Sequence, residues 1–460
     1  MAALAGALRL LYGPALVGYD GMYSLVWGRD LAEGRLPDFT APTAPTPHPL
    51  ANLVAAPLSL LGEHALTVLT ALSFVAFAAA ALAAFDFGRS LLAAPVGALF
   101  AALLLTRDHL IFATLQSLVD IPFIALVLSA AALEARKLGR GTAVLTLLIL
   151  AGLLRPEGWL LSGGYALWLA YRSEGGRARA TVLVAGAAAP LIWCVFDLAV
   201  TGDPFYSLHG TQELAERLAR PRGFGTSLTS TSAYLGYVVR QPWLIAGIFG
   251  LVVGARVFAS QSILPLAILV CGLGSFVALG VAHLPLLTRY LLLPAVTLCY
   301  FAAVAGLGWL VYRDHGWGRR AWMAAAGALA IAGLIGAPRQ VERIDNVTAA
   351  ARTRIELQDR LQDLVAGAAA EPVLARCAQI YASSSLAVPL VIYATGRPAA
   401  VVRSVGTVLP RGGALITATN PTVDRRFILD PREARYRVIA TPPGFGRVTG
   451  NAAFVLSERC

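Results

Sequence analysis

Long apolar runs alternate with short polar loops along most of the chain. Several of these runs are shorter than the roughly 20 residues that a complete span needs, so flanking residues must complete them. The pattern predicts an α-helical polytopic membrane protein with about 10–11 transmembrane helices. The ten candidate spans are Ala65–Phe85, Leu91–Thr106, Val119–Leu133, Thr142–Leu154, Trp159–Tyr171, Thr181–Val200, Trp243–Ala255, Ile263–Gly280, Leu291–Val311 and Ala321–Gly336.

Arg-bearing loops indicate the orientation of these spans, because loops rich in Lys and Arg stay in the cytoplasm. Every second loop carries such residues, at Arg89, Arg136, Arg172, Arg256 and Arg313. The opposite side would then hold residues 18–48, the segment from Thr201 to Gln241, and everything after Ala337. The sequence therefore predicts an outer face made of these segments.

The first segment, Met1–Val17, is short for a span and carries Arg9 in its middle. We expect a first transmembrane helix whose cytoplasmic half lies upstream of Met1. An interfacial helix and a cleaved signal are the alternatives.

From about residue 337 the composition becomes polar, which predicts a second domain. We expect a transmembrane domain over 1–336 and a small extracytoplasmic α/β domain over 337–460. Its cysteines, Cys377 and Cys460, could form a disulfide or remain two free thiols. The expected helices are Ile344–Val365 and Ser384–Tyr393, and the expected strands are Val373–Tyr381, Ala399–Val402, Ala414–Thr419, Arg435–Ala440 and Ala453–Ser457.

Composition supports the membrane class. The 460 residues are 57% hydrophobic and only 14% charged, which is too apolar for a soluble protein of this length. The net charge of +11 is explained by orienting loop arginines, so we expect no nucleic-acid partner. Lys137 is the only lysine, a bias that suggests a bacterial source and hence the cytoplasmic (plasma) membrane. The spacing of the cysteines and histidines predicts no structural metal site.

Charged residues near the ends of membrane segments are candidates for function, because they are costly to place there. Most of them lie on the predicted outer side. A carboxylate could accept the proton of an acceptor hydroxyl, and arginine binds phosphate oxygens in a bidentate manner. Activated sugar donors at that face are lipid-linked, so the predicted donor is a polyprenyl-phosphate sugar.

Several short motifs follow one another in the first 294 residues. Tyr19-Asp20-Gly21-Met22-Tyr23, followed by Arg29 to Gly34, resembles the first-loop motif of the GT-C membrane glycosyltransferases, which include protein O-mannosyltransferases and aminoarabinose transferases. Gly21 stands where many relatives have Glu. The other similar motifs are Pro47–Leu50, Asp120–Phe123, Arg155–Gly158, Gly202–Phe205 and Thr288–Tyr290.

The resemblance implies roles for three residues. Asp20 would be the catalytic base or an acid that positions the acceptor, Asp120 a supporting acid, and Arg289 a phosphate contact. The charges of Arg155 and His109 add two further phosphate candidates. Because Gly21 removes a second acid from the motif, Asp20 would act alone there.

His48 and Tyr23 complete the substrate-binding candidates. Each of these residues also has a purely structural interpretation. Asp20 could be a turn residue, Asp120 a helix cap, Arg155 an ion-pair partner of Glu157, Arg289 an interfacial anchor, and His48 and His109 polar loop residues.

The sequence thus predicts an inverting glycosyltransferase that moves a sugar from polyprenyl phosphate to a protein, lipid or glycan acceptor. The lipid-linked donor is the only cosubstrate predicted, although acids from separate loops could converge on a divalent metal. A transporter or lipid flippase and a non-catalytic envelope scaffold are the alternatives.

Overall fold

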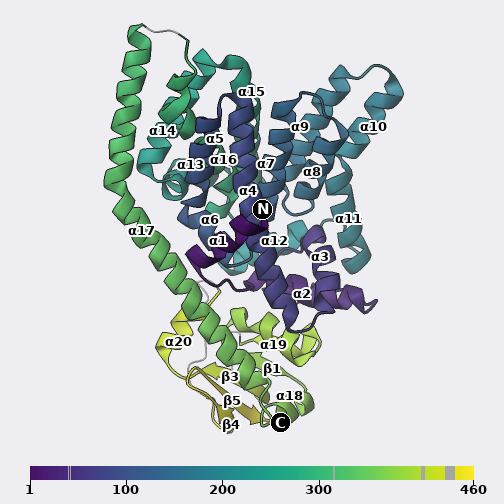
Figure 1. Ribbon diagram of the computed structural model, residues 1–460. Helices are drawn as coiled ribbons and strands as arrows, with labels where there is room; N and C mark the ends of the chain where they lie inside the picture. Colours follow the sequence, from purple (N-terminus) through teal and green to yellow (C-terminus); the bar gives the residue numbers. More distant parts are fainter. Residues whose placement is uncertain (40, 42, 314–315, 406–409, 430–440) are drawn as a thin grey trace. The chain divides into compact units, whose positions relative to one another are not determined.

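The computed structural model describes residues 1–39, 41, 43–313, 316–405, 410–429 and 441–460 (Figure 1). The chain forms two compact units, each assembled from three separate segments. The helical unit comprises Met1–Pro14, Thr70–Phe196 and Pro221–Thr348. The mixed unit comprises Ala15–Leu69, Asp197–Arg220 and Ala349–Cys460. The boundary that the sequence predicts at residue 337 falls inside one long helix and remains a prediction.

The helical unit is built from α-helices and two short 3₁₀ helices. Three of its helices, α4, α11 and α17, continue into the mixed unit. In chain order the elements are α1 (Ala2–Tyr12), α4 (His64–Leu91), α5 (Ala94–Leu105), α6 (Asp108–Leu115), α7 (Asp120–Arg136), α8 (Thr142–Gly152), α9 (Glu157–Arg172), α10 (Gly176–Gly186), α11 (Ala188–Thr201), α13 (Phe224–Val239), α14 (Gln241–Val257), α15 (Ala259–Val281), η1 (Thr288–Leu291), α16 (Leu292–Leu307), η2 (Gly308–Leu310) and α17 (Trp317–Val365).

All ten predicted spans fold as helices, which confirms the helical membrane class. Within the described residues, four spans are long and apolar enough to cross a membrane singly. Three more do so only as bent pairs, with angles of 59° between α5 and α6, 51° between α10 and α11, and 109° between α13 and α14. The last three are α7, α8 and α9, which have only 17, 11 and 16 residues.

Helix α16 forms the core of the helical unit. Its residues are buried on all sides from Leu292 to Ala305, as expected for an apolar helix enclosed by others. Small residues on α14 allow the two backbones to approach closely. A Cβ atom at Gly250 would lie 1.8 Å from the carbonyl oxygen of Phe301, so no larger side chain fits there.

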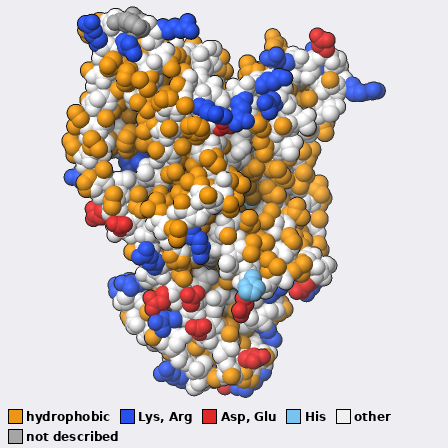
Figure 2. Space-filling view, viewed as in Figure 1, with side chains coloured by type: hydrophobic (Ala, Val, Ile, Leu, Met, Phe, Trp, Pro, Cys, Tyr) orange, Lys and Arg blue, Asp and Glu red, His pale blue; other side chains and the backbone are white. Residues whose placement is uncertain are grey.

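The surface of the helical unit is largely apolar, as a lipid-facing surface requires (Figure 2). Lys and Arg side chains gather at the end of this unit where α10 and the start of α17 lie. These segments carry exposed arginines, among them Arg177, Arg179 and Arg320. The distribution follows the alternation of basic loops along the sequence.

The mixed unit combines short helices with one sheet. Its elements, besides the ends of α4, α11 and α17, are α2 (Tyr19–Ala32), α3 (Pro49–Ser59), α12 (Tyr206–Arg217), α18 (Glu371–Arg376), β1 (Ile380–Ala382), η3 (Ser385–Ala387), α19 (Val388–Thr395), η4 (Ala399–Val401), β2 (Val402–Ser404), β3 (Gly413–Ala418), α20 (Pro421–Arg426), β4 (Gly446–Gly450) and β5 (Phe454–Arg459).

The sheet has five strands in the order β2-β1-β3-β5-β4. Strand β1 pairs in parallel with β2 and β3, whereas β5 is antiparallel to β3 and β4. Every residue of β3 is buried, as is typical of a central strand covered on both faces. The small extracytoplasmic module predicted from the sequence is therefore an α/β structure.

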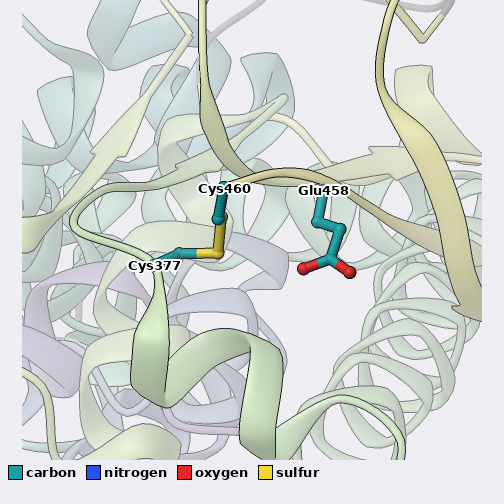
Figure 3. Close-up of side chains that lie close together, drawn as sticks. All are labelled: Cys377, Glu458 and Cys460. Atoms are coloured by element: carbon teal, nitrogen blue, oxygen red, sulfur yellow. A yellow bond between two sulfur atoms is a disulfide. The ribbon is translucent and has the colours of Figure 1, made fainter.

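A disulfide joins Cys377, which directly follows α18, to the final residue Cys460 (Figure 3). The two Cα atoms are 5.6 Å apart, within the range that a disulfide needs. The bond ties the segment that enters β1 to the end of β5. Of the two alternatives left open by the sequence, the structure has the disulfide.

Several predicted elements were wrong in type or extent. Residues 373–376 of the first predicted strand belong to α18, because Glu371 and Pro372 provide a favourable first turn of a helix, and only its last two residues lie in β1. Of the second predicted strand, Ala399–Val402, residues 399–401 form the 3₁₀ helix η4, and the observed strand β2 begins only at Val402. The segment from Thr201 to Gln241, which the sequence predicted as one long outer loop, contains helices α12 and α13.

The predicted strand over Arg435–Ala440 lies outside the described residues. Strand β4 was not predicted, since its sequence Gly446–Gly450 lacks apolar alternation. The first helix, α1, ends at Tyr12, where Gly13 takes a left-handed φ of 88°.

Candidate functional site

Asp20 lies in the first turn of a helix, whereas the sequence predicted a loop. Gly18 adopts an extended conformation before α2, and the helix then continues for 14 residues. The backbone N–H groups at a helix N-terminus favour a nearby ionised carboxylate. The Asp20 side chain is half-buried. It is therefore a partly accessible acid held on a regular helix.

Aromatic side chains on α2 support this position. Tyr19, Tyr23 and Trp27 follow one another at helical spacing, with ring centroids 5.1 Å apart in each step. The Tyr19 hydroxyl donates a hydrogen bond to the carbonyl oxygen of Thr43, at 2.8 Å. The column continues from Trp27 to Phe39, at 4.8 Å. These contacts fix the start of α2 against the segment that follows it.

Tyr23 is fully buried within this column, so the structure places it in the packed interior of the mixed unit. Burial raises the pKa of the Tyr23 phenol. Its hydroxyl therefore stays protonated at neutral pH and can act only as a neutral group.

His48 occupies the N-cap position of α3, and its side chain is half-buried. One turn further, Asn52 is completely buried. Among the described residues, neither atom of its carboxamide has a hydrogen-bond partner. Buried amides are rarely left in this state. Asn52 could not be singled out from the sequence, because an isolated Asn in an apolar helix has no distinguishing pattern.

In the helical unit, Asp120, Arg155 and Glu157 form one buried ionic group, named here the Arg155 cluster. Asp120 begins α7 and Glu157 begins α9. All three side chains are nearly inaccessible, with exposed fractions of 1%, 5% and 5%. The Arg155 guanidinium bonds directly to Asp120, and its Nη2 lies 2.5 Å from Oε1 of Glu157.

The ion pair between Arg155 and Glu157 is thus present, as one interpretation of the sequence suggested, and Asp120 adds a second partner. Two carboxylates share one guanidinium, so the cluster carries one negative charge in excess when all groups are ionised. Among the described residues, Oδ2 of Asp120 has no hydrogen-bond partner. This oxygen is available to a ligand or a proton.

Tyr290 connects this cluster to Arg289. The Arg155 guanidinium lies 5.0 Å from the centre of the Tyr290 ring, and the Arg289 guanidinium lies 5.7 Å from it. Both distances are in the range of cation–π contacts. Three of the predicted residues, Asp120, Arg155 and Arg289, are therefore close neighbours in the helical unit. Tyr290 is a further member, for which the motif Thr288-Arg289-Tyr290 was the available signal.

His109 belongs to a different group of the helical unit. Its Nδ1 lies 3.5 Å from Oδ2 of Asp108, and its ring packs edge-on against Tyr237 at 4.6 Å. Asp108 is in turn bonded by Arg240. His109 is therefore a neighbour of the Asp108–Arg240 pair.

The Gly202–Phe205 motif has a structural role at the start of α12. The backbone N–H of Phe205 donates to Oδ1 of Asp203 at 2.9 Å, and Nδ1 of His209 lies 2.6 Å from Oδ2 of Asp203. Asp197 accepts two hydrogen bonds from Ser207, at 2.8 and 2.9 Å. These contacts anchor the first turn of α12.

One group of potential metal ligands occurs in the described part of the chain. It consists of Cys377, Glu458 and Cys460 (Figure 3). The two sulfur atoms are bonded to each other, so neither is the thiolate that a metal requires. This group is a structural disulfide beside an acid.

Comparisons with known proteins concern the fold. A scan against protein-family models gives no match, and a search of curated protein sequences gives no significant match. Among solved structures, the chain is similar to ArnT from Cupriavidus metallidurans bound to undecaprenyl phosphate, with a TM-score of 0.53 and 14% identity. That match covers 99% of this chain and 96% of the other.

The oligosaccharyltransferase of Archaeoglobus fulgidus is also similar. Its apo form gives a TM-score of 0.53 at 12% identity, over 91% of this chain and 68% of that one. Its complex with Zn and sulfate gives a TM-score of 0.51 at 14% identity, over 86% and 61% of the two chains. Both neighbours are GT-C proteins. The chain therefore shares the fold of these two proteins, which is the GT-C fold expected from its motifs.

Proposed function

We propose that this protein is a membrane glycosyltransferase that moves a sugar from a polyprenyl-phosphate donor to an acceptor hydroxyl. The observation that carries the proposal is the position of Asp20, a half-buried acid at the N-terminus of α2, within a chain that has the GT-C fold. The ArnT structure is of a protein bound to undecaprenyl phosphate, which supports a lipid phosphate as the leaving group.

In the proposed reaction, the acceptor oxygen attacks the anomeric carbon of the sugar and its proton passes to the Asp20 carboxylate. The bond between that carbon and the phosphate oxygen breaks, and its electron pair leaves with the polyprenyl phosphate. One displacement inverts the configuration at the anomeric carbon. No other reactant is needed for the atoms and charges to balance.

The Arg155 cluster has a supporting role in this scheme. Arg155 already spends N–H groups on two carboxylates, so we assign it to positioning Asp120 and Glu157. Arg289 is the better candidate for the departing phosphate. Its guanidinium lies beside the cluster, where its single positive charge would balance the excess negative charge and its N–H groups would bind the phosphate oxygens. His48, Tyr23 and His109 remain substrate-binding candidates with no assigned step.

The proposed location is the bacterial plasma membrane, with transfer at its outer face and the α/β region on the same side. The positive-inside distribution of loop arginines supports this orientation. The acceptor class is protein, lipid or glycan.

The test uses membranes that contain either the wild-type protein or Asp20→Asn. They are supplied with short polyprenyl phosphates carrying each of a panel of common sugars, and the release of polyprenyl phosphate is measured. We expect at least a 100-fold loss in the variant, since general bases contribute about 10²–10⁴ in rate. The control is Asp30→Asn, an acid near the other end of α2 that pairs with Arg35 at 2.9 Å.

Two results would count against the proposal in different ways. If the wild-type protein releases no polyprenyl phosphate with any sugar of the panel, glycosyl transfer from this donor class is refuted. Equal release by wild type and Asp20→Asn would refute the role of Asp20 and leave transfer itself standing.

A second candidate function is lipid or solute transport, which the three bent helix pairs favour. Broken helices in membranes commonly surround a transport site. Proteoliposomes with a fluorescent lipid in one leaflet distinguish the two functions. Wild-type protein that moves this lipid between leaflets, and does so equally well with Asp20→Asn, would favour transport.

A further inference from the structure

A cavity of about 690 Å³ lies within the helical unit, between α17 and two helix breaks. One break separates α5 from α6, and the other separates α13 from α14. Among the described residues, none that lines it belongs to the Arg155 cluster. The cavity is large enough for a lipid headgroup and the first part of a tail.

Four arginines line this cavity: Arg107, Arg240, Arg339 and Arg343. Arg107 is only 4% exposed, which makes it an unusually buried cation for a membrane protein. One carboxylate, that of Asp108, pairs with a member of this group, Arg240. Positive charge is therefore in excess.

The guanidinium groups of buried Arg107 and half-buried Arg240 are held by the protein and still keep donors in reserve. Arg107 uses three of its N–H groups: Nη1 donates to the carbonyl oxygen of Val239 at 2.9 Å, Nε to that of Leu103 at 3.2 Å, and Nη2 to the hydroxyl of Thr106 at 3.2 Å. Arg240 uses its Nε and Nη2 for Asp108. Since each guanidinium has five N–H groups, both can also bind an oxyanion.

The other wall of the cavity is apolar and formed by small residues. The Trp243 ring packs against Gly333 of α17, since a Cβ there would lie 3.0 Å from it. At Gly336 a Cβ would meet no atom within 4 Å, so the cavity is open there. The apolar run of α17 ends at this glycine, and the charged segment with Arg339 and Arg343 begins three residues later.

A helix that changes from apolar to basic residues in this way is typical of a segment that crosses a membrane–water interface, which is where lipid phosphates lie. We propose that the cavity binds the phosphate headgroup of an anionic membrane lipid, with the four arginines on the phosphate and the tail beside Gly333 and Gly336. The inference is independent of the proposed glycosyl transfer. It assigns a lipid site that none of the sequence motifs indicated.

The test measures equilibrium binding to the full-length protein, delipidated in a non-ionic detergent. Four probes are compared: dioctanoyl phosphatidylglycerol, dioctanoyl phosphatidylcholine, a short polyprenyl phosphate and inorganic phosphate. We expect at least one of the two anionic lipids to bind saturably, and at least tenfold more tightly than phosphatidylcholine and inorganic phosphate. The tighter of the two anionic lipids identifies whether the tail is acyl or isoprenoid.

The double variant Arg339→Gln/Arg343→Gln should weaken lipid binding roughly 30-fold. Its control is Arg320→Gln/Arg352→Gln, which removes the same charge from exposed positions of α17 outside the cavity. Gly336→Leu should weaken binding of the lipids while leaving that of inorganic phosphate unchanged, because it fills the tail space and keeps every charge.

Three outcomes would overturn the proposal. They are a lack of saturable binding of either anionic lipid, equally tight binding of inorganic phosphate, and equal losses in the arginine pair and its control. Gel filtration and the unfolding temperature establish that each variant is folded before binding is compared.

Discussion

Replacing Arg155 by methionine should destabilise the protein strongly. The change removes the shared partner of Asp120 and Glu157, whose side chains are 1% and 5% exposed. Breaking a buried ion pair by removing one member typically costs about 3–5 kcal/mol, because the remaining charge stays buried. Here two carboxylates lose their partner, so we expect the upper part of that range.

A loss of that size is a large fraction of the roughly 5–15 kcal/mol that stabilises a typical folded protein. The assay is unfolding of the purified protein by dodecyl sulfate in mixed micelles, which gives the free energy of unfolding. The matched control is Arg177→Met, an exposed arginine at the start of α10, where we expect a change of at most about 0.5 kcal/mol.

The triple variant Arg155→Met/Asp120→Asn/Glu157→Gln separates charge from packing. It removes all three charges at once, and neutral replacement of a buried ionic group is often tolerated. We expect it to recover most of the stability that the single variant loses. If Arg155→Met alone unfolds like the wild type, or the triple variant is no better than the single one, the cluster is not an electrostatic unit.

Three further changes test the packing and the covalent bond. Gly28→Ala should lower the free energy of unfolding by about 1–3 kcal/mol through overpacking, because its Cβ would lie 2.6 Å from the backbone of α3. Gly163→Ala is the control, since its Cβ would meet no atom within 4 Å, and thermal unfolding compares the two variants. The Cys377–Cys460 disulfide joins residues 83 positions apart, so its reduction should lower the stability of the mixed unit by up to about 4.5 kcal/mol. A reductant should lower the unfolding midpoint of the wild type and leave that of the Cys377→Ser/Cys460→Ser variant unchanged. Asn52→Leu should be neutral or should raise the stability by about 1–3 kcal/mol, since it removes an unsatisfied buried amide; a clear loss of stability would mean that the amide is satisfied.

The helical class and the ten apolar segments could be predicted because their signal is local: apolar runs of sufficient length must be buried or face lipid. The conformation around Asp20 could not be predicted from the sequence. Gly18 and Gly21 suggested a turn. The aromatic rings at positions 19, 23 and 27 instead pack on one another along a helix, and Trp27 contacts Phe39, a tertiary contact that propensity does not include.

In the candidate site, too, contacts between residues close in the chain could be predicted, and contacts between distant residues could not. The pair of Arg155 and Glu157 could be foreseen because the two residues are close in the chain. The bonds from Arg155 to Asp120 and from Arg240 to Asp108 join residues 35 and 132 positions apart, and periodicity contains no information about such pairs. The disulfide stayed open for a similar reason: the sheet brings the two cysteines together, because β1 pairs with β3 and β3 pairs with β5, and spacing along the chain does not reveal this.

The most direct test of the central claim is mass spectrometry of the envelope glycans of a deletion strain complemented with the wild-type gene, Asp20→Asn or Asp30→Asn. If Asp20 is the base of a glycosyl transfer, the deletion lacks one sugar substituent. The wild type and Asp30→Asn then restore it, and Asp20→Asn, present in equal amount in the membrane, does not. Full restoration by Asp20→Asn, or glycans unchanged by the deletion, would contradict the claim.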